Sequence, residues 1–248
     1  MNSPEPKRRF TAVVDDYERY RPSYPEAALA WIEERADLRP GSRVVDLGCG
    51  TGISSRAFAT RGLDVTGVEP NDEMRARAVA AGGGPRYVHG EAAATGLPER
   101  CADLVAAAQA FHWFDLPATQ REARRVLRPG GRCAALWNLR ASTPFLDEYE
   151  ALLRRRSEEY AALRRPRETI AALKALSGVS GVEERWFRHS QAAALEAVLG
   201  RARSSSYVAH GVSDPAAFEA ELSALFAKHA RDGRVDFAYD TVVLLFIP

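Results

Sequence analysis

The chain has 248 residues, 46% of them hydrophobic and 27% charged, so it is long enough to bury the core of one large α/β domain. Its 34 basic and 33 acidic residues leave a net charge of +1, which lacks the single-sign field that would hold a polynucleotide. Three widely spaced cysteines, Cys49, Cys101 and Cys133, form neither a disulfide framework nor a metal-ligand pattern. We therefore expect a cytoplasmic protein without a bound metal or a nucleic-acid partner.

The N-terminal part of the chain predicts a tail followed by a helix. The first residues lack the apolar core of a signal peptide, and no apolar run approaches membrane-spanning length, so we expect no membrane partner. Pro25 opens a predicted helix from Glu26 to about Ala36, and the breakers at 39–41 end it.

Residues 44–52, V-V-D-L-G-C-G-T-G, predict a strand, a tight turn and the start of a helix that runs to about residue 61. Glycines at alternate positions tolerate positive φ and let the backbone approach a ligand closely. A dinucleotide fold asks instead for G-x-G-x-x-G, but the third glycine position holds Ile53. Asp46, just ahead of the turn, would also repel a pyrophosphate. The pattern suits a ligand with an ammonium and a sulfonium group.

A second acid follows the next predicted strand. That strand covers residues 64–68 and ends in Glu69, 23 residues after the acid of the glycine turn. An acid at this strand tip, roughly 20 residues beyond the turn, is placed to accept hydrogen bonds from two ribose hydroxyls. Asn71 or Asp72 then caps a predicted helix that runs to about Ala81.

The fourth predicted strand leads into a group of aromatic residues. After a short strand at 86–89, residues 102–108 are apolar enough to be buried on both faces of a sheet. They run into Q-A-F-H-W-F-D at 109–115. The carboxyl end of this strand adjoins the first strand at the topological switch point, where ligands bind in open parallel sheets. The two polar side chains among three aromatic residues predict a pocket wall.

The second half of the chain predicts a helical cap and further strands. Residues 143–177 interrupt the strand–helix alternation with a helical, Arg/Glu-rich pattern, which we interpret as a lid or cap with a solvated outer face. The polar turn at 204–207 is expected to face the pocket. The other predicted elements are helices at 117–127, 191–201 and 215–231, and strands at 133–137, 183–189 and 236–247, the last an antiparallel partner of the one before it.

The sequence D-L-G-C-G-T-G at 46–52 closely resembles motif I of the class I S-adenosylmethionine (SAM) methyltransferases. With the order of the elements, this resemblance implies an α/β fold: a Rossmann-like, seven-stranded, mostly parallel sheet with helices on both faces and an antiparallel final strand. It implies one domain over the whole chain, with an N-terminal helical segment (1–40), a SAM-binding core (41–139), a helical cap inserted after the fifth strand (140–182) and a C-terminal part with the closing strands (183–248).

A narrower resemblance is to the subgroup that includes trans-aconitate methyltransferase-like proteins, of methyltransferase type 11. The similar segments are Y-E-R-Y-R-P-S-Y-P at 17–25, G-V-E-P-N at 67–71, Q-A-F-H-W-F at 109–114, R-V-L-R-P-G-G at 125–131 and W-N at 137–138. Members methylate small molecules, carboxylic acids among them. The resemblance implies O-methylation of a carboxylate or hydroxyl, with N- or C-methylation also compatible, in metabolism or natural-product biosynthesis.

The resemblance also implies SAM as cofactor and S-adenosylhomocysteine (SAH) as product. Arg21 would pair the carboxylate of SAM or that of a substrate, since a guanidinium fork serves both. The adenine loop of such enzymes commonly reads G-x-A-E, but the acid position holds Ala93, so we expect the Ala92 backbone to contribute. The implied cofactor-binding residues are Tyr20, Arg21, Asp46, Gly48, Gly50, Glu69, Pro70, Met74, Ala92 and Gln109.

On the acceptor side, His112 is the candidate catalytic base, because its unperturbed pKa lies near 6.5. The alternative is a histidine that orients the substrate or donates a hydrogen bond. A carboxylate acceptor is ionised at pH 7 and needs no base, whereas a phenol, amine or carbon acceptor could need one. The expected pocket residues are Tyr17, Phe111, Trp113, Trp137 and Tyr207.

Two other functions compete with a small-molecule methyltransferase. One is a SAM-binding protein without transferase activity that acts through its cap helices. The other is a nucleic-acid methyltransferase, although exocyclic-amine enzymes carry N/D-P-P-Y where this chain reads Q-A-F-H at 109–112. The sequence is compatible with a monomer or a homodimer.

Overall fold

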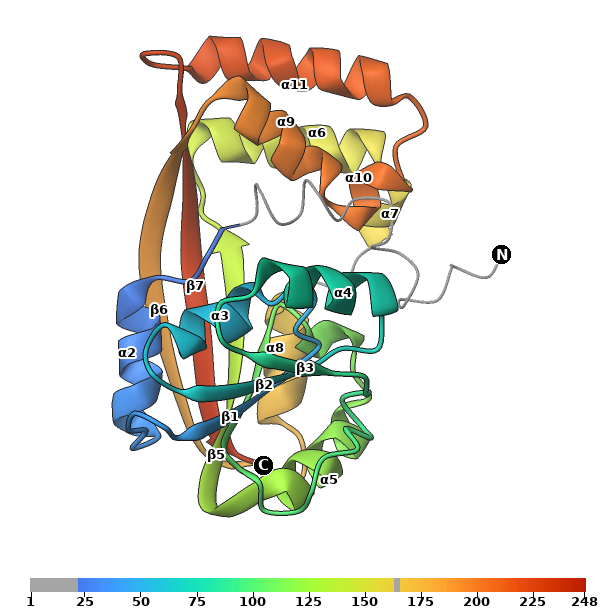
Figure 1. Ribbon diagram of the computed structural model, residues 1–248. Coiled ribbons are helices and arrows are strands. Elements are labelled where there is room, and N and C mark those ends of the chain that lie inside the picture. The colour runs from blue at the N-terminus through green and yellow to red at the C-terminus, as the bar shows by residue number, and fades with distance from the viewer. Residues whose placement is uncertain (1–21, 163–165) are drawn as a thin grey trace. The chain divides into compact units, whose positions relative to one another are not determined.

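The computed structural model describes residues 22–162 and 166–248, which form two compact units (Figure 1). The sheet unit contains residues 23–138, 166–187 and 241–248, and the helical unit contains residues 139–162 and 188–240. Strands β5, β6 and β7 each have residues in both units, so the chain passes between the units within these strands.

One seven-stranded sheet has the order β3-β2-β1-β4-β5-β7-β6. The pairs β1–β2, β1–β4, β2–β3 and β4–β5 are parallel, and β7 runs opposite to β5 and β6 (Figure 1). The predicted Rossmann-like sheet is therefore confirmed, and its antiparallel final strand, β7, lies between β5 and β6. The strands are β1 (Arg43–Leu47), β2 (Asp64–Val68), β3 (Arg86–Val88), β4 (Ala102–Ala108), β5 (Leu127–Arg140), β6 (Ser180–Ala193) and β7 (Val235–Ile247).

Side chains cap the N-termini of several helices, and the predicted cap Asn71 is confirmed. The Asn71 side chain accepts a hydrogen bond from the Met74 backbone N–H, and Asp115 accepts one from Ala118. The sheet unit holds α2 (Glu26–Arg35), α3 (Ile53–Ala59), α4 (Asp72–Ala81), the 3₁₀ helix η3 (Phe111–Trp113), α5 (Leu116–Val126) and α8 (Pro166–Lys174). The helical unit holds α6 (Pro144–Arg156), α7 (Glu158–Ala162), α9 (Leu195–Arg203), α10 (Ser206–Ala209) and α11 (Pro215–His229).

The sheet unit buries apolar side chains on both faces of its strands. Alternate side chains of a strand point to opposite faces, so neighbouring residues of β4 contact different helices. One face, which includes Leu104 and Ala106, packs on α2 and α3. The other, which includes Leu47 and Val105, lies against α5 and α8 around a small cavity. Helices on both faces were predicted and are confirmed.

The helical unit has a separate core. Aromatic rings pack against one another in it: the Phe145 and Tyr149 rings stack with centroids 6.2 Å apart, and each meets Phe237 edge-on at 6.0 Å. Leucines of α6 and α11, Leu153 and Leu222 among them, complete the packing. Helices α6, α9 and α11 of this unit therefore share one apolar core.

Strand β5 is longer than the sequence predicts. The motif at 128–131 indicates a turn before a strand at 133–137, but β5 already begins at Leu127. Its pairing with β4 shifts between Ala102, opposite Leu127, and Leu104, opposite Arg132. Gly130 has a φ of 83°, so the glycine turn is an irregularity inside the strand and not a break before it. In the part of the chain described, no helix is both long and apolar enough to cross a bilayer.

We expect Leu104→Ala to lower the free energy of unfolding by about 2–5 kcal/mol, because it leaves a cavity between the sheet and its helices. Leu104 is 0% exposed in the middle of β4. Guanidinium denaturation would measure the change. The control is Val79→Ala on α4, where the side chain is 60% exposed and the expected change is within about 0.5 kcal/mol. Equal losses in the two variants would contradict this description of the core.

Candidate functional site

The glycine turn after β1 has the conformation that its residues predict. Gly48, Gly50 and Gly52 have φ angles of 62°, 58° and 80°, a region that residues with a Cβ rarely adopt. The backbone N–H groups of Gly48 and Cys49 donate to the Val68 carbonyl at 2.8 and 3.2 Å. The turn is therefore fixed to the end of β2, at the carboxyl ends of two parallel strands.

Side chains surround the turn so closely that its glycines could not be replaced without displacement. A Cβ on Gly50 would lie 3.3 Å from the Met74 Cε, and one on Gly48 would lie 3.0 Å from the Ala110 Cβ. A Cβ on Gly52 would collide with the Tyr87 ring. The absence of Cβ atoms at these glycines therefore lets neighbouring side chains pack directly against the backbone of the turn.

Asp46, the acid ahead of the turn, is fully buried. Its Oδ2 accepts hydrogen bonds from the hydroxyls of Ser54 at 2.7 Å and Ser55 at 2.6 Å. Its Oδ1 is buried and has no hydrogen-bond partner among the described residues. Burial raises the pKa of Asp46 to about 6, against the opposing effect of the two serine hydroxyls. A buried carboxylate oxygen without a partner favours a cationic or hydrogen-donating ligand.

Glu69, at the tip of β2, is held by backbone groups from both sides. It is 8% exposed; its Oε2 accepts from the Gly50 N–H and its Oε1 from the Asn71 N–H, both at 2.9 Å. Burial raises the pKa of Glu69, while these two N–H donors oppose the increase. Each oxygen has a second lone pair. The fixed carboxylate can therefore accept two further hydrogen bonds, as a ribose diol would require.

These observations test whether the site fits SAM. A bare glycine turn, an unpartnered oxygen on Asp46 and the remaining lone pairs of Glu69 suit a ligand with a positive charge and vicinal hydroxyls. Two neighbouring buried carboxylates disfavour a pyrophosphate at the same place. The residues present fit SAM, and Asp46, Gly50 and Glu69 are those that would hold it.

Four other predicted cofactor residues lie in the same unit. Met74 is buried in the first turn of α4, and Pro70 is half-buried after Glu69. Ala92 lies between Glu91 and Ala94, whose backbones pair as an isolated bridge. Gln109 has a φ of 58°, uncommon for a residue with a Cβ.

Gln109 connects the end of β4 to β5. Its backbone N–H donates to the Leu136 carbonyl at 2.8 Å, and its side-chain Nε2 donates to the Asn138 carbonyl at 3.3 Å. Asn138 in turn accepts from the Thr241 hydroxyl at 2.6 Å. These bonds fix the chain where it leaves the sheet, immediately before His112.

His112 lies in η3 and is largely shielded from solvent. Burial lowers its pKa to about 4, so the imidazole is neutral at pH 7. Its Nδ1 is buried without a hydrogen-bond partner among the described residues, and its ring centroid lies 4.9 Å from that of Trp113. A neutral imidazole with an unused nitrogen can orient a ligand or accept a proton, but its low pKa makes it a weak base.

The other predicted pocket residues lie in different surroundings. Phe111 is buried against Trp137, with ring centroids 6.1 Å apart, and Trp137 itself is fully buried. The Trp137 Nε1 has no hydrogen-bond partner among the described residues. Tyr207 belongs to the helical unit, where its hydroxyl accepts from the Arg140 Nη1 at 3.3 Å. Residues Tyr17, Tyr20 and Arg21 lie outside the described residues.

The sequence reasoning missed the partners that fix these acids. Ser54 and Ser55, which hold Asp46, sit in the first turn of α3, and their position directly after the glycine turn is the signal that could have identified them. The Phe114 ring, whose atoms would lie 3.1 Å from a Cβ on Gly48, could not be assigned to the turn from its spacing. Within the described residues, no group of three or more His, Cys, Asp or Glu side chains could hold a metal ion.

The fold and the site define a Rossmann-like domain with a glycine turn and two buried acids at the carboxyl ends of its first two strands. Residues 45–135 match the family model described as a methyltransferase domain. A solved structure of a putative type II methyltransferase from Anaeromyxobacter dehalogenans is 28% identical, with a TM-score of 0.68 over 91% of this chain and 95% of that one. Residues 45–135 are therefore similar to methyltransferase domains, and the solved methyltransferase shares the fold of this chain.

Curated relatives share part of the chain. An uncharacterized methyltransferase of Mycobacterium tuberculosis is 42% identical over 131 residues, 53% of this chain and 52% of that protein. A malonyl-[acyl-carrier protein] O-methyltransferase of Pectobacterium atrosepticum is 37% identical over 92 residues, 37% of this chain and 36% of that protein. The match spans about half the length of the Mycobacterium tuberculosis relative, 52%, and 36% of the Pectobacterium atrosepticum relative.

We expect Glu69→Ala to weaken SAH binding by at least about tenfold, because it removes the acceptor that Gly50 and Asn71 hold in place. Isothermal titration calorimetry would measure the dissociation constant. The matched control is Glu73→Ala, an exposed acid in the first turn of α4, for which we expect unchanged affinity. Unchanged SAH affinity in Glu69→Ala would remove Glu69 from the site.

We also expect the affinity for SAH to rise with pH through about 6 and to level off above it. The pKa of Asp46 is about 6 in the free protein, and a bound ammonium would lower it, so the ionised form binds better. The gain would be at most about tenfold per pH unit below 6. Calorimetry between pH 5 and 7.5 would show the dependence, and Asp46→Asn should flatten it. The same pH profile in both proteins would contradict this role of Asp46.

Proposed function

We propose that this chain is a SAM-dependent methyltransferase that acts on a small-molecule acceptor. The observation that supports it best is the buried Glu69 carboxylate, held by the Gly50 N–H of the glycine turn and by Asn71. The family match over residues 45–135 supports the same activity. Bound SAM would supply an electrophilic methyl group on a sulfonium whose leaving group is neutral. The protein then mainly has to align the reactants and exclude water.

The cofactor end of the proposed site is built from rigid elements. Asp46 and its serine partners lie on β1 and α3, and Glu69 lies at the tip of β2. Both acids are buried and already hydrogen-bonded: Asp46 at one carboxylate oxygen and Glu69 at both. They therefore need little reorganisation when a cation enters. Tyr20 and Arg21 stay as proposed contacts of the methionine end.

The environment of His112 favours an acceptor that needs no base. With a pKa of about 4, the imidazole is neutral at pH 7 but is too weak a base to deprotonate an ordinary alcohol or amine efficiently. A carboxylate is already ionised at this pH. We therefore infer O-methylation of a carboxylate ahead of a hydroxyl, with His112 as an orienting group. The relative named as an O-methyltransferase is consistent with an oxygen acceptor.

In the helical unit, Tyr207 is the residue that we propose for binding the methyl acceptor. Its partner Arg140 is a cation, which supports an anionic methyl acceptor. Arg140 donates to the Tyr207 hydroxyl, to Glu150 at 3.0 Å and to the Tyr160 hydroxyl. Glu150 also pairs with Arg154 at 2.7 Å, so two guanidinium groups share this carboxylate. Tyr17, Phe111, Trp113 and Trp137 complete the proposed acceptor residues.

We base our proposals for the acceptor class, the cellular location and the subgroup on composition and on sequence motifs. Near-zero net charge supports a small-molecule acceptor over a nucleic acid. The cysteine usage supports a cytoplasmic location. We propose a monomer or homodimer, and membership of the trans-aconitate methyltransferase-like subgroup on the motifs at 17–25 and 109–114.

Incubation of the protein with a metabolite extract and methyl-labelled SAM, followed by mass spectrometry, tests this function. We expect a labelled product, and a methyl ester if the acceptor is a carboxylate. Calorimetry with SAH is the companion measurement. Tight SAH binding without any labelled product across a broad acceptor panel would favour a SAM-binding protein without transferase activity. Absence of SAH binding would overturn the proposal as a whole.

For the acceptor so found, we expect His112→Ala to lower kcat by about tenfold or more with less than threefold change in SAH affinity, since the imidazole orients the acceptor. His210→Ala, at an exposed histidine of the helical unit, is the control and should leave both unchanged. The wild-type kcat should show no step near pH 6.5, because the pKa of His112 lies near 4. Equal losses in kcat and SAH affinity would make His112 a cofactor-binding residue instead.

A further inference from the structure

The connection between β3 and β4 is a long segment that other parts of the sheet unit hold in place. Residues 89–101 contain no helix or strand, only the short bridge between Glu91 and Ala94. The segment starts beside the cofactor site, because the Glu69 N–H donates to the carbonyl of Val88, the last residue of β3. A segment of this length without regular structure needs specific contacts to keep one conformation.

Within this segment the chain folds back on itself between Gly90 and Thr95. A Cβ on Gly90 would lie 2.7 Å from the Thr95 carbonyl oxygen and 2.9 Å from a Val68 methyl, so the chain folds back tightly onto β2. Gly90 and Thr95 are both buried, whereas the residues between them are at least partly exposed. The turn that includes Ala92 is therefore accessible to solvent, and the buried residues Gly90 and Thr95 hold it at either end.

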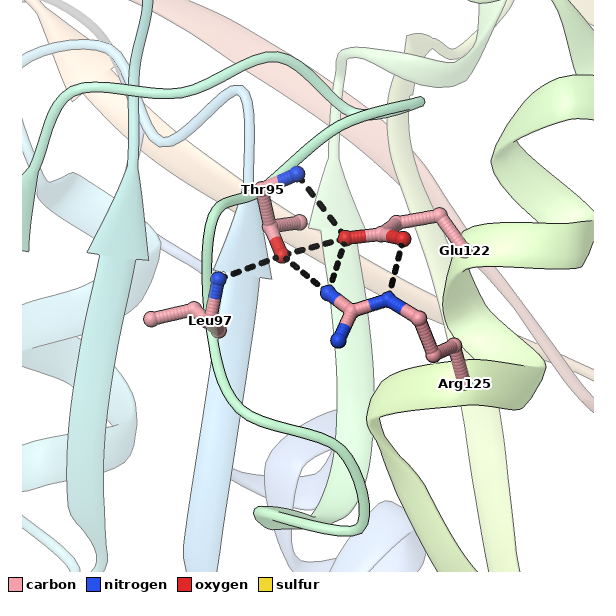
Figure 2. Close-up of polar contacts among 4 residues, drawn as sticks. All are labelled: Thr95, Leu97, Glu122 and Arg125. Atoms are coloured by element: carbon pink, nitrogen blue, oxygen red, sulfur yellow. Dashed lines mark hydrogen bonds and ion pairs between the residues drawn. The ribbon is translucent and has the colours of Figure 1, made fainter.

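Helix α5 supplies the second fixed point through Glu122, as Figure 2 shows. The Glu122 Oε1 accepts from the Thr95 N–H at 2.9 Å and from the Thr95 hydroxyl at 2.5 Å. Arg125 donates to both oxygens of the carboxylate, at 2.8 and 2.7 Å. The Thr95 hydroxyl also accepts from the Leu97 N–H at 3.2 Å. Four donated hydrogen bonds thus converge on one carboxylate.

This carboxylate is ionised over the whole range in which the protein would be assayed. Arg125 and the Thr95 donors lower the pKa of Glu122 to about 2, against the effect of its burial. The bonds to it are charge-assisted and correspondingly strong. Glu122 and Arg125 both lie on α5 and pair with each other without Thr95. The Glu122 carboxylate nevertheless also accepts from the backbone N–H and the hydroxyl of Thr95.

We propose that Glu122, with Thr95 and Arg125, positions the turn at 91–94 so that its backbone reads the adenine amino group of the cofactor. The inference rests on the proposed function. The resemblance places the adenine at this turn, and Ala93 stands where an acid was expected, so we assign the acceptor to the backbone of the turn. Backbone recognition requires a turn held to within a fraction of an ångström. Glu122 is a positioning residue, since it acts on the turn through Thr95.

The test compares SAH with S-inosylhomocysteine, in which oxygen replaces the amino group of the base. By calorimetry, the wild-type protein should bind SAH about tenfold or more tightly than the inosine analogue, the effect of one hydrogen bond. Thr95→Val, which keeps the side-chain shape, and Glu122→Gln should reduce this ratio to about threefold or less. Thr95→Ser retains the hydroxyl and should restore the wild-type ratio.

Glu33→Gln is the matched control. Glu33 on α2 likewise pairs with one arginine through both oxygens, Arg61, but lies outside the β3–β4 segment. It should lose stability in a thermal melt without any change in the ratio of the two affinities. A fall in the melting temperature of Glu122→Gln is compatible with the proposal only if the ratio falls as well.

Three outcomes would overturn the inference. In the first, Thr95→Val and Glu122→Gln bind both ligands as the wild type does. In the second, they weaken both ligands equally, which would make the network a stabilising contact alone. In the third, the wild type binds the two ligands equally well. If the wild type bound neither ligand, the proposed function itself would fail, so the two failures are distinguishable.

Discussion

The site depends on the parallel pairing of β1 with β2. This pairing places Leu47 opposite Val68, so the glycine turn and Glu69 leave the sheet side by side. Glu69 then accepts from the Gly50 N–H, and the turn donates to the carbonyl of Val68. Two acids 23 residues apart in the sequence become neighbours for this reason. Because backbone groups on rigid strands hold the Glu69 carboxylate, its position does not rely on flexible side chains.

Burial gives the acids and the histidine of the sheet unit different properties. The pKa of Asp46 is raised and that of His112 is lowered by the same cause, loss of solvation of the charged form. A cation relieves the cost at Asp46, whereas nothing among the described residues offsets it at His112. In the proposed function, the two acids on the cofactor side favour positive charge, and His112 on the acceptor side is a neutral imidazole. This contrast suits transfer of a methyl group from a cation to an acceptor that is already nucleophilic.

Support for the site extends beyond the residues that would touch a ligand. Serine hydroxyls on α3 fix Asp46, and Glu122 on α5 fixes the β3–β4 segment through Thr95 (Figure 2). Both helices follow strands whose carboxyl ends form the site. These two helices thus have a second effect, because α3 holds a carboxylate of β1 and α5 holds the β3–β4 segment at the same edge. Within the described residues, the helical unit has its own aromatic core and its own polar cluster around Arg140.

The sequence by itself determined the sheet, the glycine turn and the existence of the two acids, because apolar runs, glycine spacing and the residues at strand tips are local signals. It also located β2 and β4 to the residue. It did not reveal the irregular start of β5, the buried state of Trp137 or the partners of Asp46 and Glu122. Those depend on which distant segments meet in the packed interior, and burial, hydrogen bonding and the resulting pKa shifts exist only once the strands and helices have assembled.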